Sequence, residues 1–150
     1  MTHTFTHLVT HVIFATKDRA PLINPDMKAD LYAYMGGIVR ERGGKAIHIN
    51  GMPDHVHLLI YLPPTVAMAE AMQVLKANSS RWVHERWRDN RLFGWQRGYG
   101  AFSVSRTAIP DVERYIASQE EHHRKVTFEQ EFLVLLKLHE IEYDERYLWQ

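Results

Sequence analysis

Cysteine is absent from the 150 residues of this chain, and so are long hydrophobic runs. Without cysteine there is no disulfide scaffold, no thiolate-ligated zinc and no thiol nucleophile. The longest apolar runs, such as residues 58–62, are far shorter than the ~20 residues that cross a bilayer. No lysine or arginine precedes the apolar stretch near the N-terminus, so the charged start of a signal peptide is missing. We therefore expect a cytoplasmic protein without a membrane partner.

A net charge is also absent, because 18 lysines and arginines balance 18 aspartates and glutamates. That balance argues against a nucleic-acid partner, since nucleic-acid binders usually present a basic face to the phosphates. The charges are nevertheless unevenly placed. Residues 81–106 carry six cations against two anions, whereas residues 107–150 carry five against ten. The total of zero conceals a basic middle segment and does not exclude binding to DNA or RNA.

The length suits one domain spanning residues 1–150, because a chain of ~150 residues buries enough surface to fold without a disulfide or metal. Alternating β-branched and aromatic residues predict four strands, and apolar residues at helical spacing predict four helices. The expected strands span residues 6–16, 45–52, 55–62 and 99–105. The expected helices run from 25 to 42, from a cap at Thr65 to Trp87, from Ile109 onward, and from 127 to 139.

The order of these elements is strand, helix, strand, strand, helix, strand, followed by two helices. It predicts an α+β, ferredoxin-like (RRM-like) βαββαβ fold, in which an antiparallel sheet carries two helices on one face. The other face of the sheet must then be covered or used. RNA-recognition modules, small-ligand domains and several nucleases share this topology, so the fold alone does not decide the function.

Two histidines separated by one residue follow the turn between the second and third expected strands. Alternate side chains of a strand share one face, so His55 and His57 project together while Val56 points into the core. Imidazoles ~6–7 Å apart along a strand can converge on one divalent metal. Surface or packing histidines explain most such pairs in a chain with 10 histidines. The position on a central strand favours a metal site here.

A tyrosine and a glutamine lie four residues apart on the helix that follows the last strand. Tyr115 and Gln119 share one helical face, offset from an apolar stripe of Ile109, Val112 and Ile116. Tyrosine serves as a covalent nucleophile once it is activated, since its free pKa is about 10. A half-buried packing tyrosine beside a solvated glutamine is the alternative. His122 and His123 could add ligands or phosphate contacts, although a solvated helix end is the expectation for them.

Arginines and aromatic residues alternate in the basic middle segment. Guanidinium groups match phosphate oxygens, and aromatic rings stack on unpaired bases. The candidate DNA-binding residues are Arg81, Arg86, Arg88, Arg91, Arg97 and Arg106. The interleaved aromatic residues are Trp82, Trp87, Phe93, Trp95, Tyr99 and Phe102. A solvated helix end followed by a hydrophobic loop explains the same pattern equally well.

Together these residues resemble the HUH single-strand endonucleases, specifically the single-tyrosine transposases of small bacterial insertion sequences. HUH denotes histidine, a hydrophobic residue and histidine, which here are His55, Val56 and His57. The Tyr-x-x-x-Gln helix of the family is here Tyr115 and Gln119. The resemblance covers nearly the whole chain and extends over residues 16–19, 51–59, 76–81, 98–105, 112–119 and 128–149.

The resemblance implies that His55, His57 and Gln119 bind a divalent ion, Mg²⁺ or Mn²⁺, and that Tyr115 is the nucleophile. The tyrosine would cleave single-stranded DNA and conserve the bond energy as a 5′-phosphotyrosine, which a 3′-hydroxyl later reverses. Members of the family are homodimers that recognise DNA hairpins, and in several the tyrosine helix completes the partner's site. We therefore expect a metal-dependent endonuclease and strand-transferring transposase that acts, near the bacterial nucleoid, on hairpin ends of a mobile element.

Two other function classes compete with this expectation. A non-catalytic or domesticated nucleic-acid-binding domain of the same fold would use the arginines and aromatic residues, but it would not need all four site residues. A small metal-dependent hydrolase would pair the two histidines with a carboxylate base, for which Asp54 and Glu113 are the nearby candidates. The target hairpin and the choice between sites in cis and in trans stay open at this point.

Overall fold

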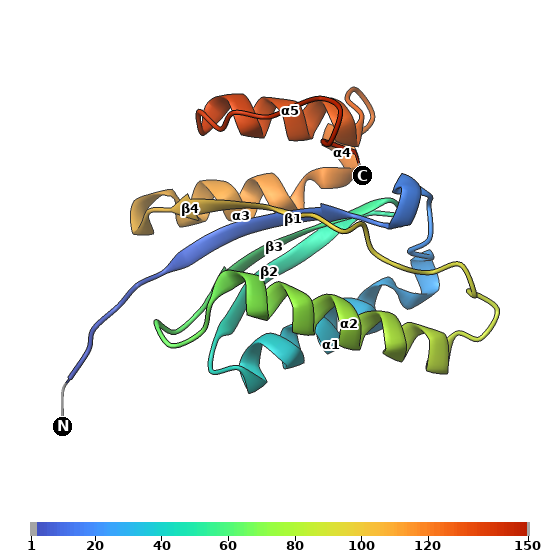
Figure 1. Cartoon of the computed structure of the whole chain (residues 1–150), viewed down its shortest axis with the longest axis horizontal. Helices are drawn as coiled ribbons and strands as arrows, with labels where there is room; N and C mark the ends of the chain where they lie inside the picture. Colours follow the sequence, from blue (N-terminus) through green and yellow to red (C-terminus); the bar gives the residue numbers. More distant parts are fainter. Residues whose placement is uncertain (1–2, 150) are drawn as a thin grey trace.

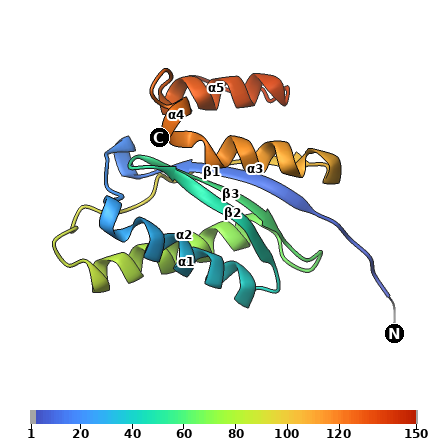
Figure 2. The ribbon, with the colours of Figure 1, turned by 180° about the vertical axis from the view of Figure 1, so that it is seen from behind.

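The computed structural model describes residues 3–149 as a three-layer arrangement with the sheet in the middle. The strands are β1 (Val9–Ala15), β2 (Lys45–Met52), β3 (His55–Tyr61) and β4 (Gly100–Val104). The helices are α1 (Pro25–Glu41), α2 (Met68–Arg86), α3 (Ile109–Ala117), α4 (Gln119–His122) and α5 (Phe128–Leu138). Figures 1 and 2 show α1 and α2 on one side of the sheet, and α3, α4 and α5 on the other.

The sheet is antiparallel, with the strand order β2-β3-β1-β4. This order confirms the ferredoxin-like topology predicted from the sequence. It makes β3 an interior strand, because His57 pairs with Ile13 of β1 on one side and with Asn50 of β2 on the other. Neighbouring strands on both sides hold the backbone of the two histidines in a fixed position.

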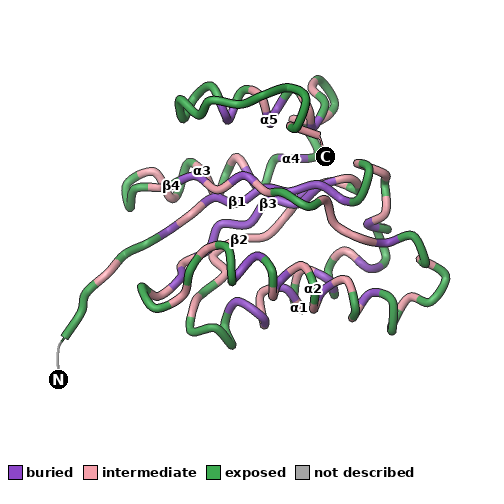
Figure 3. The backbone as a smooth tube through the Cα atoms, viewed as in Figure 1, coloured by how far each residue is buried: buried purple, intermediate pink, exposed green. Residues whose placement is uncertain are grey.

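The face of the sheet toward α1 and α2 carries the larger hydrophobic core. Val12, Phe14, Val56 and Leu58 alternate inward along β1 and β3 and are fully buried. Helices α1 and α2 meet them with apolar residues at helical spacing, including Met27, Leu31, Met35, Met72 and Leu75. Figure 3 shows buried stretches along β1 and β3 and at intervals along α1 and α2. The alternation predicted for the third strand is therefore present, with Val56 in the core.

The opposite face is covered by the chain after residue 108. Phe128, Phe132 and Leu135 of α5 pack on Ile13 and Phe102 of the sheet, and Ile116 of α3 packs with Val9 and Leu59. Arg19 ties the C-terminal segment to the sheet, since it pairs with Glu129 at 3.0 Å and lies over the Trp149 ring. Side chains on this face of the sheet are therefore enclosed between the strands and the helices α3, α4 and α5.

Three local predictions differ from the structure. The first strand begins at Val9 and not at residue 6. Thr65 caps no helix, because α2 begins at Met68 with Ala67 in the cap position. The helix that starts at Ile109 is interrupted at Ser118, so that α3 and a short α4 replace one continuous element. By contrast, α5 starts with a reciprocal capping box at Thr127, close to its predicted first residue.

Among residues 3–149, no helix combines the length and the apolar character needed to cross a bilayer.

Candidate metal and tyrosine site

The two histidines of β3 lie on the face of the sheet covered by α3, α4 and α5. Both side chains are fully buried, and Val56 between them faces the other way. Their rings lie 5.2 Å apart between centroids. His55 and His57 therefore lie on the same face of β3 and converge on one point, as predicted from their spacing.

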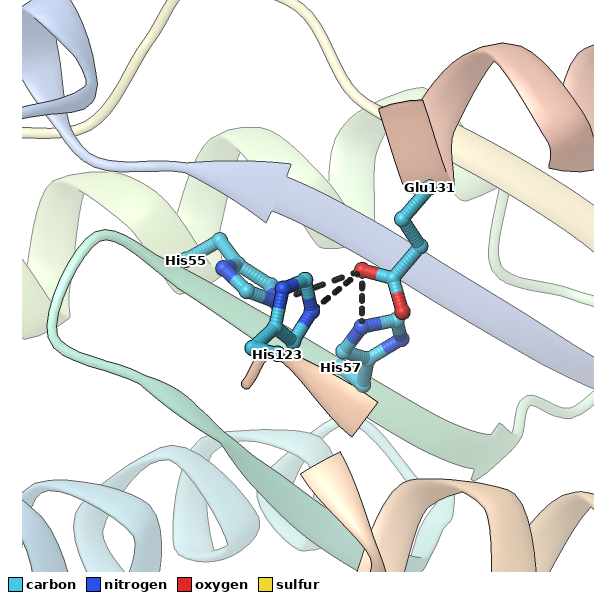
Figure 4. Close-up of side chains that lie close together, drawn as sticks. All are labelled: His55, His57, His123 and Glu131. Atoms are coloured by element: carbon cyan, nitrogen blue, oxygen red, sulfur yellow. Dashed lines mark hydrogen bonds and ion pairs between the residues drawn. The ribbon is translucent and has the colours of Figure 1, made fainter. Parts of the chain in front are cut away.

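That point is occupied by a carboxylate from α5. The Oε1 atom of Glu131 lies 3.0 Å from Nε2 of His57, 3.0 Å from Nε2 of His123 and 3.3 Å from Nε2 of His55. Figure 4 shows the three rings turned toward this one oxygen. Glu131 is only 3% exposed, so its charge is balanced by the imidazoles and not by water. We call His55, His57, His123 and Glu131 the histidine–glutamate cluster.

Gln119 joins the cluster from α4. Its Oε1 lies 3.0 Å from Nε2 of His55, and its Nε2 donates to Oε2 of Glu131 at 3.0 Å. The side chain is fully buried. The structure therefore brings Gln119 to the two histidines as expected, and the alternative of a solvated glutamine is wrong.

The interruption of the helix at Ser118 sets the position of Gln119. Asn50 of β2 donates from Nδ2 to the backbone oxygen of Ile116 at 2.9 Å, which satisfies a carbonyl that a longer helix would use. Ser118 adopts a φ of −95° and a ψ of 20°, and the chain then turns inward. Gln119 thus reaches the cluster through a bend, and not along the continuous helical face predicted from its spacing.

Both strand histidines are oriented by a second hydrogen bond. Nδ1 of His55 lies 2.7 Å from Oδ1 of Asp54, and Nδ1 of His57 lies 2.8 Å from Nε2 of His11 on β1. The His11 and His57 rings also stack, with centroids 5.0 Å apart. Such outer partners hold each ring so that its Nε2 atom points into the site. Asp54 is thereby a partner of His55 and not a member of the cluster.

Burial controls the protonation of these histidines. It lowers the pKa of His11 to about 3 and the pKa of His57 to about 4. Burial alone would also lower the pKa of His55, but hydrogen bonds to Asp54 and Glu131 and the charges of both carboxylates raise that pKa to about 9. In the metal-free protein near neutral pH, His55 is therefore the charged ring, and His11 and His57 are neutral.

The tyrosine hydroxyl belongs to the same network. Tyr115 donates to Oε2 of Glu131, and its ring lies edge-on to those of His11 and His57, with centroids 6.1 and 5.8 Å away. Burial and the bond to Glu131 raise the pKa of Tyr115 above its usual value. Hydrogen bonds from the imidazoles outweigh burial and hold the pKa of Glu131 below its usual range. The tyrosine thus keeps its proton in the metal-free protein.

The donor set fits a divalent cation. Three imidazole nitrogens and one carboxylate oxygen lie within 4.8 Å of one another. A bound cation would take the place of the imidazole protons that now point at Glu131, and the outer partners Asp54 and His11 already fix the rings. The cluster is therefore a candidate metal site for which His55, His57, His123 and Glu131 supply ligand atoms.

Acid is expected to destabilise the fold through His11. The pKa of His11 is 6.5 in the unfolded chain and about 3 in the folded protein. Between these two pH values the unfolded chain binds a proton at His11 and the folded protein does not. The free energy of unfolding therefore has its full value above pH 6.5 and decreases as the pH is lowered, by about 2–3 kcal/mol at pH 4.5. Urea unfolding in EDTA should show that His11→Gln loses less stability than the wild type between pH 7 and 4.5. The exposed His7→Gln serves as a control, and equal losses in all three proteins would contradict this assignment.

The six candidate arginines lie elsewhere. All of them are exposed, and Arg81 and Arg86 project from α2, which covers the face of the sheet opposite the cluster (Figure 1). Arg86 lies over the Trp82 and Trp87 rings. Of the interleaved aromatic residues, Phe93 and Phe102 are only 3% and 2% exposed and cannot stack on a base. Arg81 and Arg86 are thus separated from the cluster by the sheet.

The sequence interpretation misplaced one cluster member, which it had named as a possible ligand, and missed another. His123 was expected at a solvated helix end, but its side chain is only 6% exposed. Glu131, and not Glu113, is the carboxylate that meets the histidines. The only sequence signal for Glu131 is a charged residue on the apolar face of its helix, at i+3 from Phe128 and i+4 from Thr127. A buried acid on such a face calls for a partner.

A family model described as "Transposase IS200 like" matches residues 4–119 of the chain. The matched segment contains His55, His57, Tyr115 and Gln119. It ends before His123 and Glu131.

Two curated relatives are similar over most of the chain. The ISDra2 transposase TnpA of Deinococcus radiodurans is 28% identical over 114 residues, which make up 73% of this chain and 81% of the relative. The transposase for insertion sequence element IS200 of Salmonella typhimurium is 25% identical over 130 residues, or 83% of this chain and 84% of the relative.

Two solved structures share the fold. A crystal structure of a Deinococcus radiodurans protein described as a transposase has a TM-score of 0.64 at 23% identity and covers 79% of this chain and 95% of its own. The structure of a REP-associated tyrosine transposase bound to a REP hairpin has a TM-score of 0.61 at 13% identity, with coverages of 84% and 76%.

Proposed function

The chain belongs to the IS200-like transposase family, and on that premise we propose that it is a metal-dependent endonuclease and strand transferase for single-stranded DNA, acting as a single catalytic domain. One observation carries the proposal. The Tyr115 hydroxyl donates to Glu131, the same carboxylate on which His55, His57 and His123 converge. A nucleophile and a candidate cation site therefore share one side chain.

In the proposed reaction the Tyr115 oxygen forms a bond to phosphorus, and the bond from phosphorus to the 3′ oxygen breaks. Oε2 of Glu131 receives the tyrosine proton, and the departing 3′ oxygen takes a proton from solvent. The product is a 5′-phosphotyrosine, which a 3′-hydroxyl reverses in strand joining, so no ATP is needed. A cation held by the cluster would polarise the phosphate as a Lewis acid.

The two oxygens of Glu131 support separate roles. Oε1 faces the imidazoles of His55, His57 and His123. Oε2 faces Tyr115 and Gln119, with Nε2 of His122 3.3 Å away. The raised pKa of Tyr115 and the lowered pKa of Glu131 oppose proton transfer in the metal-free protein. The chain's own groups thus keep the nucleophile protonated, with its hydroxyl hydrogen-bonded to Oε2 of Glu131.

The proposed ligands are His55, His57 and Gln119, joined by His123 and Glu131. Imidazole-rich sites favour transition metals, while Mg²⁺ prefers oxygen ligands. Among the two ions expected from the resemblance, this donor set favours Mn²⁺ over Mg²⁺.

The test is a covalent-trapping assay. We expect a protein–DNA band on a denaturing gel after incubation with a pool of single strands that contain random stems, loops and flanks. EDTA should abolish the band, and Mn²⁺ should restore it at a lower concentration than Mg²⁺. His57→Ala should behave like EDTA treatment, because it removes a ligand from the interior strand. Undiminished adduct in EDTA would refute the metal role.

We propose single-stranded DNA hairpins as the substrate and the exposed arginines as their phosphate contacts. A homologous structure holds a REP hairpin, and Arg81, Arg86, Arg88, Arg91, Arg97 and Arg106 supply cations without using the cluster. A second copy of the chain is the proposed protein partner.

Within such a dimer we propose active sites in cis, because Tyr115 contacts Glu131 and His57 of its own chain. Mixing Tyr115→Phe with His57→Ala protein should then leave adduct formation absent. Recovery of roughly a quarter of wild-type adduct in the mixture, as expected for statistical exchange between inactive partners, would instead indicate sites completed in trans. Co-purification of an untagged copy with a tagged copy after mixing controls for exchange.

A further inference from the structure

A cavity of about 660 Å³ lies between β4, α3 and α5, with Tyr115 and Glu131 in its wall. Figure 1 shows α3 and α5 one above the other on this side of the sheet, joined through α4. The cavity therefore adjoins the proposed nucleophile and borders the histidine–glutamate cluster at Glu131, while His55, His57 and His123 do not line it.

The cavity leads away from the nucleophile along both helices. Val112 precedes Tyr115 by one turn of α3, and Val134 and Leu138 follow Glu131 by one and two turns of α5. Because α3 and α5 run in opposite directions, these side chains line the same stretch. The cavity therefore extends from Tyr115 along both helices.

The lining favours a flat apolar group over a phosphate. Val134 and Leu138 are 63% and 72% exposed, which leaves two large apolar side chains uncovered beside the opening. The exposed His139 ring lies at the same cavity and stacks on the buried Phe102 ring, with centroids 4.4 Å apart, so His139 supplies an aromatic group of the lining that a base can reach. Among the described residues that line it there is no lysine or arginine, and Asp111 and Glu131 would repel a phosphate.

We propose that this cavity, the base pocket, binds the unpaired base of the nucleotide whose 5′-phosphate becomes attached to Tyr115. The inference rests on the proposed function, because it takes Tyr115 as the nucleophile. The volume lies within the range of about 300–1,000 Å³ typical of ligand sites. Another cavity, of about 610 Å³, contains Asp54 and His123 but not Tyr115, so it does not receive the attached nucleotide.

The pocket makes the first nucleotide after the cut a determinant of specificity. Bases in single-stranded sites are held by stacking on rings and apolar side chains, and removing one stacked base costs roughly tenfold or more in binding. Sequencing the DNA attached to Tyr115 from the random pool should therefore show a biased base at this first position.

A substrate resynthesised from the selected strands tests the pocket directly. An abasic residue at the first position should lower the initial rate of adduct formation roughly tenfold, while an abasic residue several nucleotides further on should not. Val134→Trp places a large ring in the pocket and leaves Tyr115 and Glu131 unchanged. It should slow adduct formation with the intact strand by a similar factor, so that the intact and the abasic strand react at equal rates in this variant. Leu92→Trp, at an exposed site outside the pocket, is the matched control.

The outcomes separate the two proposals. No adduct with any strand would overturn the proposed function and this inference together. Adducts with an unbiased first base and no effect of the abasic residue would overturn the base pocket alone. If Val134→Trp instead changed the oligomeric state in sedimentation and left base selection intact, a second copy would be the occupant, and the base pocket would be wrong.

Discussion

Replacing Tyr115 by phenylalanine is expected to lower covalent adduct formation by at least about 10³-fold, as loss of a nucleophile does in other covalent enzymes. The substitution removes only the hydroxyl that donates to Glu131. The ring contacts with His11 and His57 remain, so folding and hairpin binding should persist. The measurement is the yield of protein–DNA band per bound strand, with binding followed separately by gel shift.

Tyr147→Phe is the matched control, because Tyr147 is 62% exposed and distant in sequence from the cluster. Its adduct yield should equal that of the wild type. An adduct that survives Tyr115→Phe at wild-type level would show that another side chain attacks the phosphate. Loss of hairpin binding together with the adduct would mean that the tyrosine supports the fold or the DNA surface and not the chemistry.

Replacing Glu131 by glutamine is expected to slow adduct formation by about 10²–10⁴-fold, the range seen when an acid–base group is removed. The side chain keeps its size but loses the charge that faces four imidazoles and the Tyr115 hydroxyl. A ligand role and a proton-acceptor role give different results in this variant. Excess Mn²⁺ should restore metal binding, measured by calorimetry, but the reaction should stay slow and its pH–rate profile should shift.

Glu129→Gln on the same helix is the control, since Glu129 points outward and pairs with Arg19. It should leave both metal affinity and rate within about twofold of the wild type, as surface ion pairs contribute little. Full recovery of the rate of Glu131→Gln by excess Mn²⁺ would eliminate the proton-acceptor role. An unchanged metal affinity would eliminate the ligand role.

Much of the fold was predictable because it follows from local periodicity. Alternation along residues 55–62 places Val56 and Leu58 in the core and leaves His55 and His57 on the other face, as the structure confirms. The element order is sufficient to predict the ferredoxin-like sheet. Family resemblance added roles for Tyr115 and Gln119, which no periodicity could supply and which stay predictions.

The remainder of the site depends on contacts between distant segments. His11 meets His57 across two paired strands, and Glu131 reaches the histidines only because the apolar face of α5 packs on Ile13 and Phe102. The sequence does not show which residue either of them contacts, although the position of Glu131 on the apolar face of α5 indicates that it is buried. The interruption at Ser118 is equally invisible in the sequence, and it lies next to a hydrogen bond between segments far apart in the chain, from the Asn50 side chain to the carbonyl of Ile116.

The division of the cluster between β3 and α5 also has a consequence in time. Glu131 follows His57 by 74 residues, and a bacterial ribosome adds roughly 5–20 residues per second. A nascent chain therefore carries both strand histidines for several seconds before the carboxylate is made. The complete cluster exists only in molecules synthesised beyond residue 131, so premature termination before that point leaves the histidines without their shared oxygen.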